Sequence, residues 1–199
     1  NNDATSQFST LSGGEDNTTS GAHATVGGGD TNTASGQFST VGGGEINTAS
    51  NIYCTVSGGR NCQSTGDSSV NGGGYFNLST NTYTTVGGGR QNQANAARST
   101  ISGGSGNNAN GEKSSIGGGL SNTASGESST VGGGESNTAS GLRSFLGGGL
   151  SNTASNDRAT VGGGSLNNAS NAYSTVSGGE KNTASGYGAT ISGGLQAVA

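Results

Sequence analysis

The amino-acid sequence repeats itself every 15 residues. The unit is typified by Asn32-Thr-Ala-Ser-Gly36-Gln-Phe-Ser-Thr-Val41-Gly-Gly-Gly44, and it recurs with almost no insertion from Leu11 to Ile191. A fixed period of this kind is typical of stacked repeat architectures, in which each unit contacts only its neighbours. We number positions within the unit by the first copy, so that residues 11 and 26 both occupy position 11. About 13 units follow one another in this register.

Each unit carries two short alternating patterns. Positions 2 and 4 usually hold Asn and Ala, and positions 9 and 11 usually hold Ser and an aliphatic residue. Alternation with a period of two predicts strands whose alternate side chains face inward, whereas the glycine runs and β-branched residues argue against helix. The chain also lacks proline, which would remove a backbone donor. The sequence therefore predicts an all-β, single-domain β-solenoid (β-roll) over residues 1–199, with about 13 coils and two short strands per coil.

The corners of the coil are predicted from the remaining positions. Position 6 is mostly Gly or Asn, and positions 13 and 14 are Gly in every unit. Because Gly and Asn tolerate left-handed backbone best, we expect left-handed residues at position 6 and a glycine corner at positions 13 and 14. All charged residues except Asp3 fall at positions 15, 1, 7 or 8, which we expect to be exposed corners.

Two segments of the unit, Asn32-Thr-Ala34-Ser-Gly36 and Ser39-Thr-Val41-Gly-Gly43, carry a family resemblance. They resemble the YadA-like heads of trimeric autotransporter adhesins, which contain Hep/Hag repeats, and related repeats of bacterial and phage fibres. That family has a unit one residue shorter. The resemblance implies a left-handed β-roll, association of three chains side by side, and a structural rod in a fibre on a cell or virion surface, with an adhesive role.

Position 8 forms a column of aromatic residues that later becomes cationic. An aromatic column of this kind favours either binding of a glycan or a host surface, or simple stacking between coils. The opposite corner carries Tyr75 and Phe76, where an interaction site and a local adjustment of packing both fit. The candidate adhesive edge residues are Phe8, His23, Phe38, Tyr53, Tyr83 and Tyr173.

Position 10 holds threonine in most coils and predicts a flat threonine face. The unit is similar to the repeats of ice-binding β-rolls from grasses, so ice binding is the alternative function. Threonine also simply suits an exposed strand. A second threonine column at position 3 is interrupted by Gln63, Leu78, Gln93 and Asn108. The residues of the candidate face are Thr10, Thr25, Thr40, Thr55, Thr85, Thr100, Thr130, Thr160, Thr175 and Thr190.

Several functions are not expected. The chain has one histidine, His23, and no His/Cys/Asp cluster with metal-ligand spacing, so we expect no enzyme activity, no metal and no cofactor. A net charge of −4 argues against nucleic acid as a partner. No apolar run approaches the roughly 18 residues of a membrane span, so membrane insertion is not expected either.

Cysteine and glycosylation motifs give further expectations. Cys54 and Cys62 occupy positions 9 and 2, too far apart for a bridge, so we expect two free thiols. Asn17, Asn77 and Asn168 begin formal glycosylation motifs, and we expect all three in the inward asparagine column, where no sugar could be attached.

Assembly is predicted from the two ends of the repeat array. No helix or proline-bearing cap covers either end, and Leu195 and Val198 give the final segment an apolar character. We expect the partner to be the chain itself, by end-to-end stacking or lateral trimerisation, or further repeats of a longer chain.

Overall fold

The computed structural model describes residues 1–199, which divide into two compact units, Asn1–Arg98 and Ser99–Ala199. Each unit is all-β, and each coil of 15 residues contains two strands of two residues, at positions 3–4 and 10–11. The strands of the first unit are β1 (Asp3–Ala4), β2 (Thr10–Leu11), β3 (Thr18–Thr19), β4 (Thr25–Val26), β5 (Thr33–Ala34), β6 (Thr40–Val41), β7 (Thr48–Ala49), β8 (Thr55–Val56), β9 (Gln63–Ser64), β10 (Val70–Asn71), β11 (Leu78–Ser79), β12 (Thr85–Val86) and β13 (Gln93–Ala94). Those of the second are β14 (Thr100–Ile101), β15 (Asn108–Ala109), β16 (Ser115–Ile116), β17 (Thr123–Ala124), β18 (Thr130–Val131), β19 (Thr138–Ala139), β20 (Phe145–Leu146), β21 (Thr153–Ala154), β22 (Thr160–Val161), β23 (Asn168–Ala169), β24 (Thr175–Val176), β25 (Thr183–Ala184) and β26 (Thr190–Ile191).

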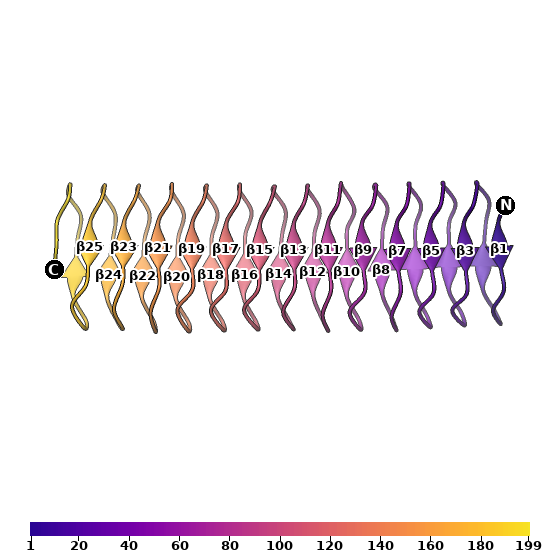
Figure 1. Cartoon of the computed structure of the whole chain (residues 1–199), viewed down its shortest axis with the longest axis horizontal. Coiled ribbons are helices and arrows are strands. Elements are labelled where there is room, and N and C mark those ends of the chain that lie inside the picture. The colour runs from indigo at the N-terminus through magenta and orange to yellow at the C-terminus, as the bar shows by residue number, and fades with distance from the viewer. The chain divides into compact units, whose positions relative to one another are not determined.

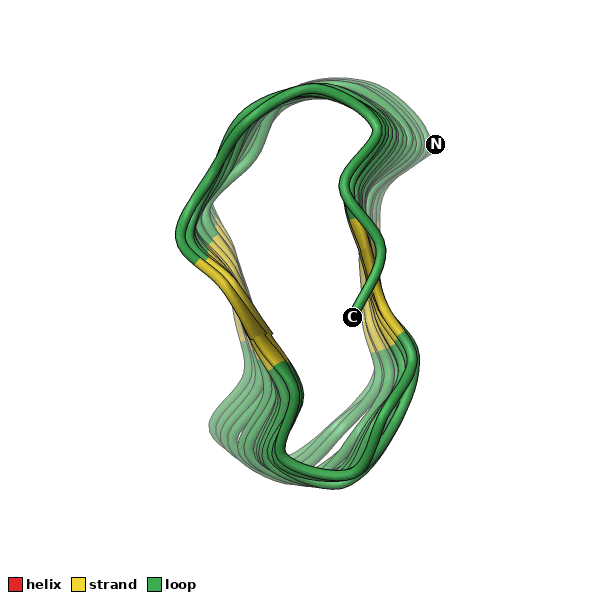
Figure 2. Ribbon diagram, turned by 90° about the vertical axis from the view of Figure 1, so that its left-hand side faces the viewer, coloured by secondary structure: helices red, strands yellow, loops and turns green.

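Within each unit the odd-numbered strands form one parallel sheet and the even-numbered strands form a second (Figure 1). Every strand pairs with the strand one coil away and in register, as Thr33 does with Thr48 and Val41 with Val56. Viewed along the stack, each coil is a flattened loop with its two strands on opposite long sides (Figure 2). The predicted β-solenoid with about 13 turns of roughly 15 residues is confirmed.

The interior of the loop is thin and filled by small residues. Val26, Ala34, Val41 and Ala49 are completely buried and belong to one continuous cluster, which contains side chains from both sheets. Large aliphatic side chains at position 11 thus share the interior with alanine at position 4, as the sequence predicts. Each coil buries little apolar surface by itself, so stacking on neighbouring coils is needed for stability.

Buried asparagines at position 2 form a hydrogen-bonded column, the asparagine ladder. The backbone N–H of Asn137 donates to Oδ1 of Asn122 at 3.0 Å, and its Nδ2 donates to the carbonyls of Gly133 at 3.0 Å and Gly149 at 2.8 Å. Its Oδ1 accepts from the backbone N–H of Asn152 at 2.9 Å. Both polar atoms of each such amide are therefore satisfied inside the coil, which removes the cost of burying them.

The expectation of left-handed backbone at position 6 is wrong. The left-handed non-glycine residues lie instead at positions 1 and 8, as with Ile46 at φ 58° and Phe38 at φ 58°. Glycine at position 6 has a different cause: a Cβ on Gly126 would lie 2.0 Å from the carbonyl oxygen of Gly141 in the next coil. The corner at positions 13 and 14 is confirmed, and Gly134 there has φ +87°.

Both cysteines are buried and free, as predicted. Cys54 donates from Sγ to the carbonyl of Gly66 at 2.9 Å, and Cys62 interrupts the asparagine ladder. Burial raises the pKa of the Cys62 thiol. The interior next to Cys62 is unusually polar, because Asn71 replaces the aliphatic residue and donates from Nδ2 to the carbonyl of Asn77 at 2.8 Å.

The expectation that all three glycosylation motifs begin in the asparagine ladder is wrong for one of them. Asn17 and Asn77 are completely buried in the ladder. In the third motif the ladder position is occupied by Asn167, and Asn168 is the next residue, half-buried on the outer side of β23. Alternation along the strand turns these two neighbours to opposite faces.

Candidate binding surfaces

Four residues at position 8, namely Phe8, His23, Phe38 and Tyr53, form a stacked aromatic edge on the first unit. Consecutive ring centroids lie 5.0, 4.9 and 5.1 Å apart, and the ring planes differ by 15° or less. Backbone hydrogen bonds between coils hold this edge in place, since His23 N–H donates to the carbonyl of Gln7 at 3.0 Å. All four side chains are exposed. Of the two alternatives drawn from the sequence, stacking between coils is present at these four residues, and their rings are also exposed.

The other two predicted aromatic residues lie apart from this edge. Ser68 separates Tyr83 from Tyr53 within the position-8 column. Tyr173, in the second unit, lies 5.4 Å from Tyr187 and under the guanidinium of Arg158, which is 5.2 Å from its ring centroid. The column therefore offers one aromatic edge and a separate cation–aromatic cluster.

The threonine face consists of side chains on the even-numbered strands. Thr10, Thr25, Thr40 and Thr55 are consecutive and in register in the first unit. Thr10 and Thr190 are exposed, and the other threonines of this face are half-buried. Val70, Ser115 and Phe145 interrupt the column. The face is regular over short stretches, with one threonine per coil.

Exposed ion pairs lie at the corners of the coils. Lys113 Nζ lies 3.1 Å from a carboxylate oxygen of Glu112 and 3.5 Å from one of Glu127. The hydrogen bond from Lys113 to Glu112 raises the pKa of this ammonium group. Arg60 pairs with Glu45 at 3.1 Å in the same way. Because these groups are solvent-exposed, each pair contributes little to stability.

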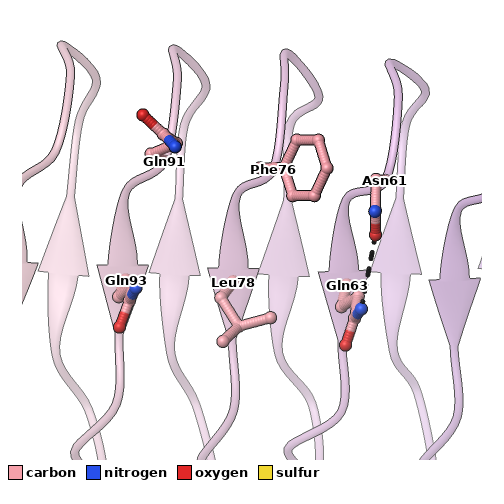
Figure 3. A pocket seen from close by; sticks show the side chains of 6 residues that line it. All are labelled: Asn61, Gln63, Phe76, Leu78, Gln91 and Gln93. Atoms are coloured by element: carbon pink, nitrogen blue, oxygen red, sulfur yellow. Dashed lines mark hydrogen bonds between the residues drawn. The ribbon is translucent and has the colours of Figure 1, made fainter.

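A shallow pocket lies on the outer side of the odd-numbered sheet in the first unit (Figure 3). It has a volume of about 290 Å³. Its six residues come from positions 1 and 3 of three successive coils, and we call it the Phe76 pocket. They are Asn61, Gln63, Phe76, Leu78, Gln91 and Gln93.

Sequence reasoning found only part of this pocket. It singled out Phe76, but it treated Gln63, Leu78 and Gln93 as interruptions of a threonine column. The signal was nevertheless present, because the period places positions 1 and 3 of neighbouring coils side by side. Comparing adjacent columns, rather than each column alone, would have revealed the array.

The residues expected at the assembly end are accessible. Leu195 is 66% exposed and Val198 is 75% exposed. Leu195 pairs with Glu180 of the preceding coil, and Val198 pairs with Thr183. Both side chains therefore continue columns that run along the outside of the second unit.

No group of three or more His, Cys, Asp or Glu side chains lies close enough together to hold a metal ion. The chain contains no helix that is long and apolar enough to cross a membrane.

Comparison with known proteins gives one match to a family model, described as the Ubiquitous surface protein adhesin repeat. It covers residues 174–186, which run from Ser174 at an inward position through the corner glycines to Gly186. No curated protein matches the chain. The matched segment is 13 residues long, so this chain is similar to an adhesin repeat over slightly less than one coil.

Proposed function

We propose that the chain is a structural rod in an extracellular fibre on a cell or virion surface, with an adhesive role and no catalytic activity. The match to the adhesin repeat is the observation that carries this proposal. In-register stacking supports it, because each added coil extends such a protein without a change in fold. The resemblance to YadA-like heads adds the proposal that three chains associate side by side.

The adhesive contact is proposed at the aromatic edge of Phe8, His23, Phe38 and Tyr53. Aromatic side chains bring large contact area at low conformational cost, and they are common at binding hot spots. Exposed rings held by stacking and by backbone hydrogen bonds are already ordered before a partner arrives. A rigid edge of this kind loses little further entropy on binding.

Adhesion is tested with beads that carry the purified chain, exposed to host-cell monolayers and washed under flow. A matched variant replaces Phe8, Phe38 and Tyr53 with serine, which occupies the same column at Ser68 and Ser128. We expect the chain to increase bead retention, and the serine variant to return it to the level of uncoated beads. Equal retention of both kinds of bead would contradict adhesion through this edge.

Ice binding by the threonine face is a second candidate. The observation that favours it is the in-register run from Thr10 to Thr55 on a regular parallel sheet. An ice-recrystallisation assay distinguishes the two functions. If the chain slows ice-crystal growth and a Thr25→Lys, Thr40→Lys variant does not, ice binding by this face is established. If the chain leaves crystal growth unchanged, ice binding is excluded.

A further inference from the structure

The Phe76 pocket is a two-by-three array of side chains. Leu78 on β11 pairs in register with Gln63 on β9 and with Gln93 on β13, which places three position-3 side chains in one column. Asn61, Phe76 and Gln91 stand beside them at position 1 of the same coils. The middle row is therefore apolar, and both outer rows are amides (Figure 3).

The aromatic ring of this array is held in a fixed place. Phe76 has φ 55°, so its backbone occupies the restricted left-handed region. Its ring meets the ring of Tyr75 edge to face, with centroids 4.5 Å apart and planes at 73°. Phe76 is 43% exposed, and Figure 3 shows its ring between the two rows of amides.

Neighbouring residues orient the amides around the ring. Gln63 Nε2 donates to Oδ1 of Asn61 at 3.4 Å. The Oε1 of Gln91 accepts from Arg90 at 3.2 Å, and the Oε1 of Gln93 accepts from Asn95 at 3.3 Å. These contacts use the carbonyl oxygens of Gln91 and Gln93, which leaves their NH₂ groups as donors, and they leave the Oε1 of Gln63 as an acceptor.

The lining indicates a class of ligand. It contains no charged side chain, but it offers neutral donors and acceptors on both sides of an apolar strip. Sugars combine an apolar face of C–H groups with hydroxyl groups that both donate and accept hydrogen bonds. The partly positive C–H groups of one ring face suit the negative face of an aromatic ring. A volume of about 290 Å³ is at the small end of ligand pockets and suits one or two sugar rings.

Packing alone does not account for this array. At position 3, most other coils carry threonine, as at Thr33 and Thr138, and at position 1 several carry serine, as at Ser121 and Ser136. Those coils form the same strands and the same left-handed corner. The fold therefore does not require an aromatic ring and four amides on the outside of these three coils.

We propose that the Phe76 pocket binds a neutral pyranose sugar, with one C–H face of the sugar on the Phe76 ring and its hydroxyl groups on the flanking amides. The Phe76 pocket and the aromatic edge are different surfaces, with no residue in common. Sugar binding in the pocket therefore does not depend on the surface role of the rod.

The test is a titration of the purified chain with methyl β-galactoside, lactose and maltose, in which saturation-transfer NMR measures binding. We expect a millimolar dissociation constant for at least one of these sugars, as is usual for a small open site. Phe76→Ser should weaken binding at least tenfold, and Gln63→Thr with Gln93→Thr should weaken it as well. All three substitutions install residues that other coils carry at these positions, so the variants should fold, which circular dichroism checks.

The matched control is Ile46→Ser, which removes an apolar side chain of similar exposure at position 1, 42% compared with 43% for Phe76. This variant should bind as the unmodified chain does. Sialyllactose is the charged probe. Absence of binding to all three neutral sugars, equal binding by the Phe76→Ser variant, or binding of sialyllactose alone would overturn the proposal. Any of these results would leave the proposed rod function standing, because the assay uses only purified chain and soluble sugar.

Discussion

The residue type allowed at a position in this fold is limited mainly by contact with the following coil. Gly134 illustrates this at position 14, where φ is +87° and a Cβ would lie 2.2 Å from the carbonyl oxygen of Gly149. A Cβ on its neighbour Gly133 would have no atom within 4 Å, and Gly133 has no left-handed φ. In this coil, position 14 therefore requires glycine and position 13 does not, although every coil carries glycine at both.

This difference predicts the effect of adding one methyl group. Gly134→Ala should lower the free energy of unfolding by at least about 2 kcal/mol, since it combines backbone strain with a steric clash. Gly133→Ala should change it by less than about 1 kcal/mol, and it should be neutral or stabilising because alanine restricts the unfolded chain. Thermal unfolding followed by circular dichroism compares the two. Similar losses in both variants would contradict the geometry of this corner.

Single coils differ in how their corner at position 6 is built. Where this residue is glycine, its N–H donates to the next coil, as Gly126 does to Ala139 at 3.2 Å. Where it is asparagine, the side chain takes over part of this work: Asn156 Oδ1 accepts from Asp157 N–H at 2.8 Å, and its Nδ2 reaches the carbonyl of Ser170 at 3.5 Å. Asparagine is thus tolerated because its amide replaces a backbone contact.

The coil that contains Cys62 is the one where the asparagine ladder is broken. Cys62 keeps the hydrogen bond to the preceding coil, because its N–H donates to Asn47 Oδ1 at 2.9 Å. Its thiol reaches the carbonyl of Arg60 at 3.8 Å and the backbone of Asn77, but it cannot replace an amide that donates twice. This coil should therefore be less stable than its neighbours.

Cys62→Asn should restore the ladder. The new Nδ2 can donate to the carbonyls of Gly58 and Gly74, as Asn137 does in its own coil, and the new Oδ1 can accept from Asn77. We expect the free energy of unfolding to rise by about 1–3 kcal/mol, from two or three added hydrogen bonds. Cys54→Ser, at a position where serine is common, is the control and should have little effect. A loss of stability in Cys62→Asn would contradict this account of the ladder.

The same variant predicts a change in pH dependence. Since burial raises the pKa of the Cys62 thiol above its usual 9.0, the unfolded chain loses this proton at lower pH than the folded chain. Stability from this group is therefore complete below about pH 9 and falls as the pH rises further. Cys62→Asn should remove that part of the decline, and unfolding curves measured between pH 7 and pH 10.5 test it.

The whole molecule is described by one rule, which is that equivalent residues stack. At positions 10 and 12 the N–H groups point toward the following coil, as Thr175 donates to Ala189 at 2.8 Å and Ser177 to Ile191 at 2.9 Å. At β26 the N–H of Thr190 therefore points away from the preceding coil. A second copy stacked in register on residues 196–199 would place its Asp3 next to Val198.

This register predicts the charge dependence of self-association for a sample of these 199 residues. The chain should associate end to end as its concentration rises. Val198→Asp should suppress association, because its carboxylate would then face Asp3 of the second copy directly. Val198→Lys places an opposite charge there and should preserve it. Sedimentation velocity measures all three, and equal behaviour of the acidic and basic variants would exclude this contact.

Much of the fold could be predicted from the sequence, because the same residue types recur at the inward positions 2, 4, 9 and 11 of most coils. The free thiols and the two strands per coil could be predicted from period and alternation alone. The cause of glycine at position 6 could not, since close approach of another coil and left-handed backbone select the same residue. The Phe76 pocket was incompletely predicted for a related reason: it is formed by residues such as Phe76 and Gln93 that are distant in sequence and adjacent only after stacking.

The most direct test of this account compares the removal of a whole coil with the removal of half a coil. Deleting residues 122–136 joins Ser121 to Asn137 and keeps every later side chain in its column. Deleting residues 122–129 places the strand that follows against the wrong face of the coil. Thermal unfolding followed by circular dichroism should show a cooperative transition within a few degrees of the unmodified chain for the first variant, and a large loss of β-structure for the second. Equal damage from both deletions would show that the 15-residue coil is not the structural unit.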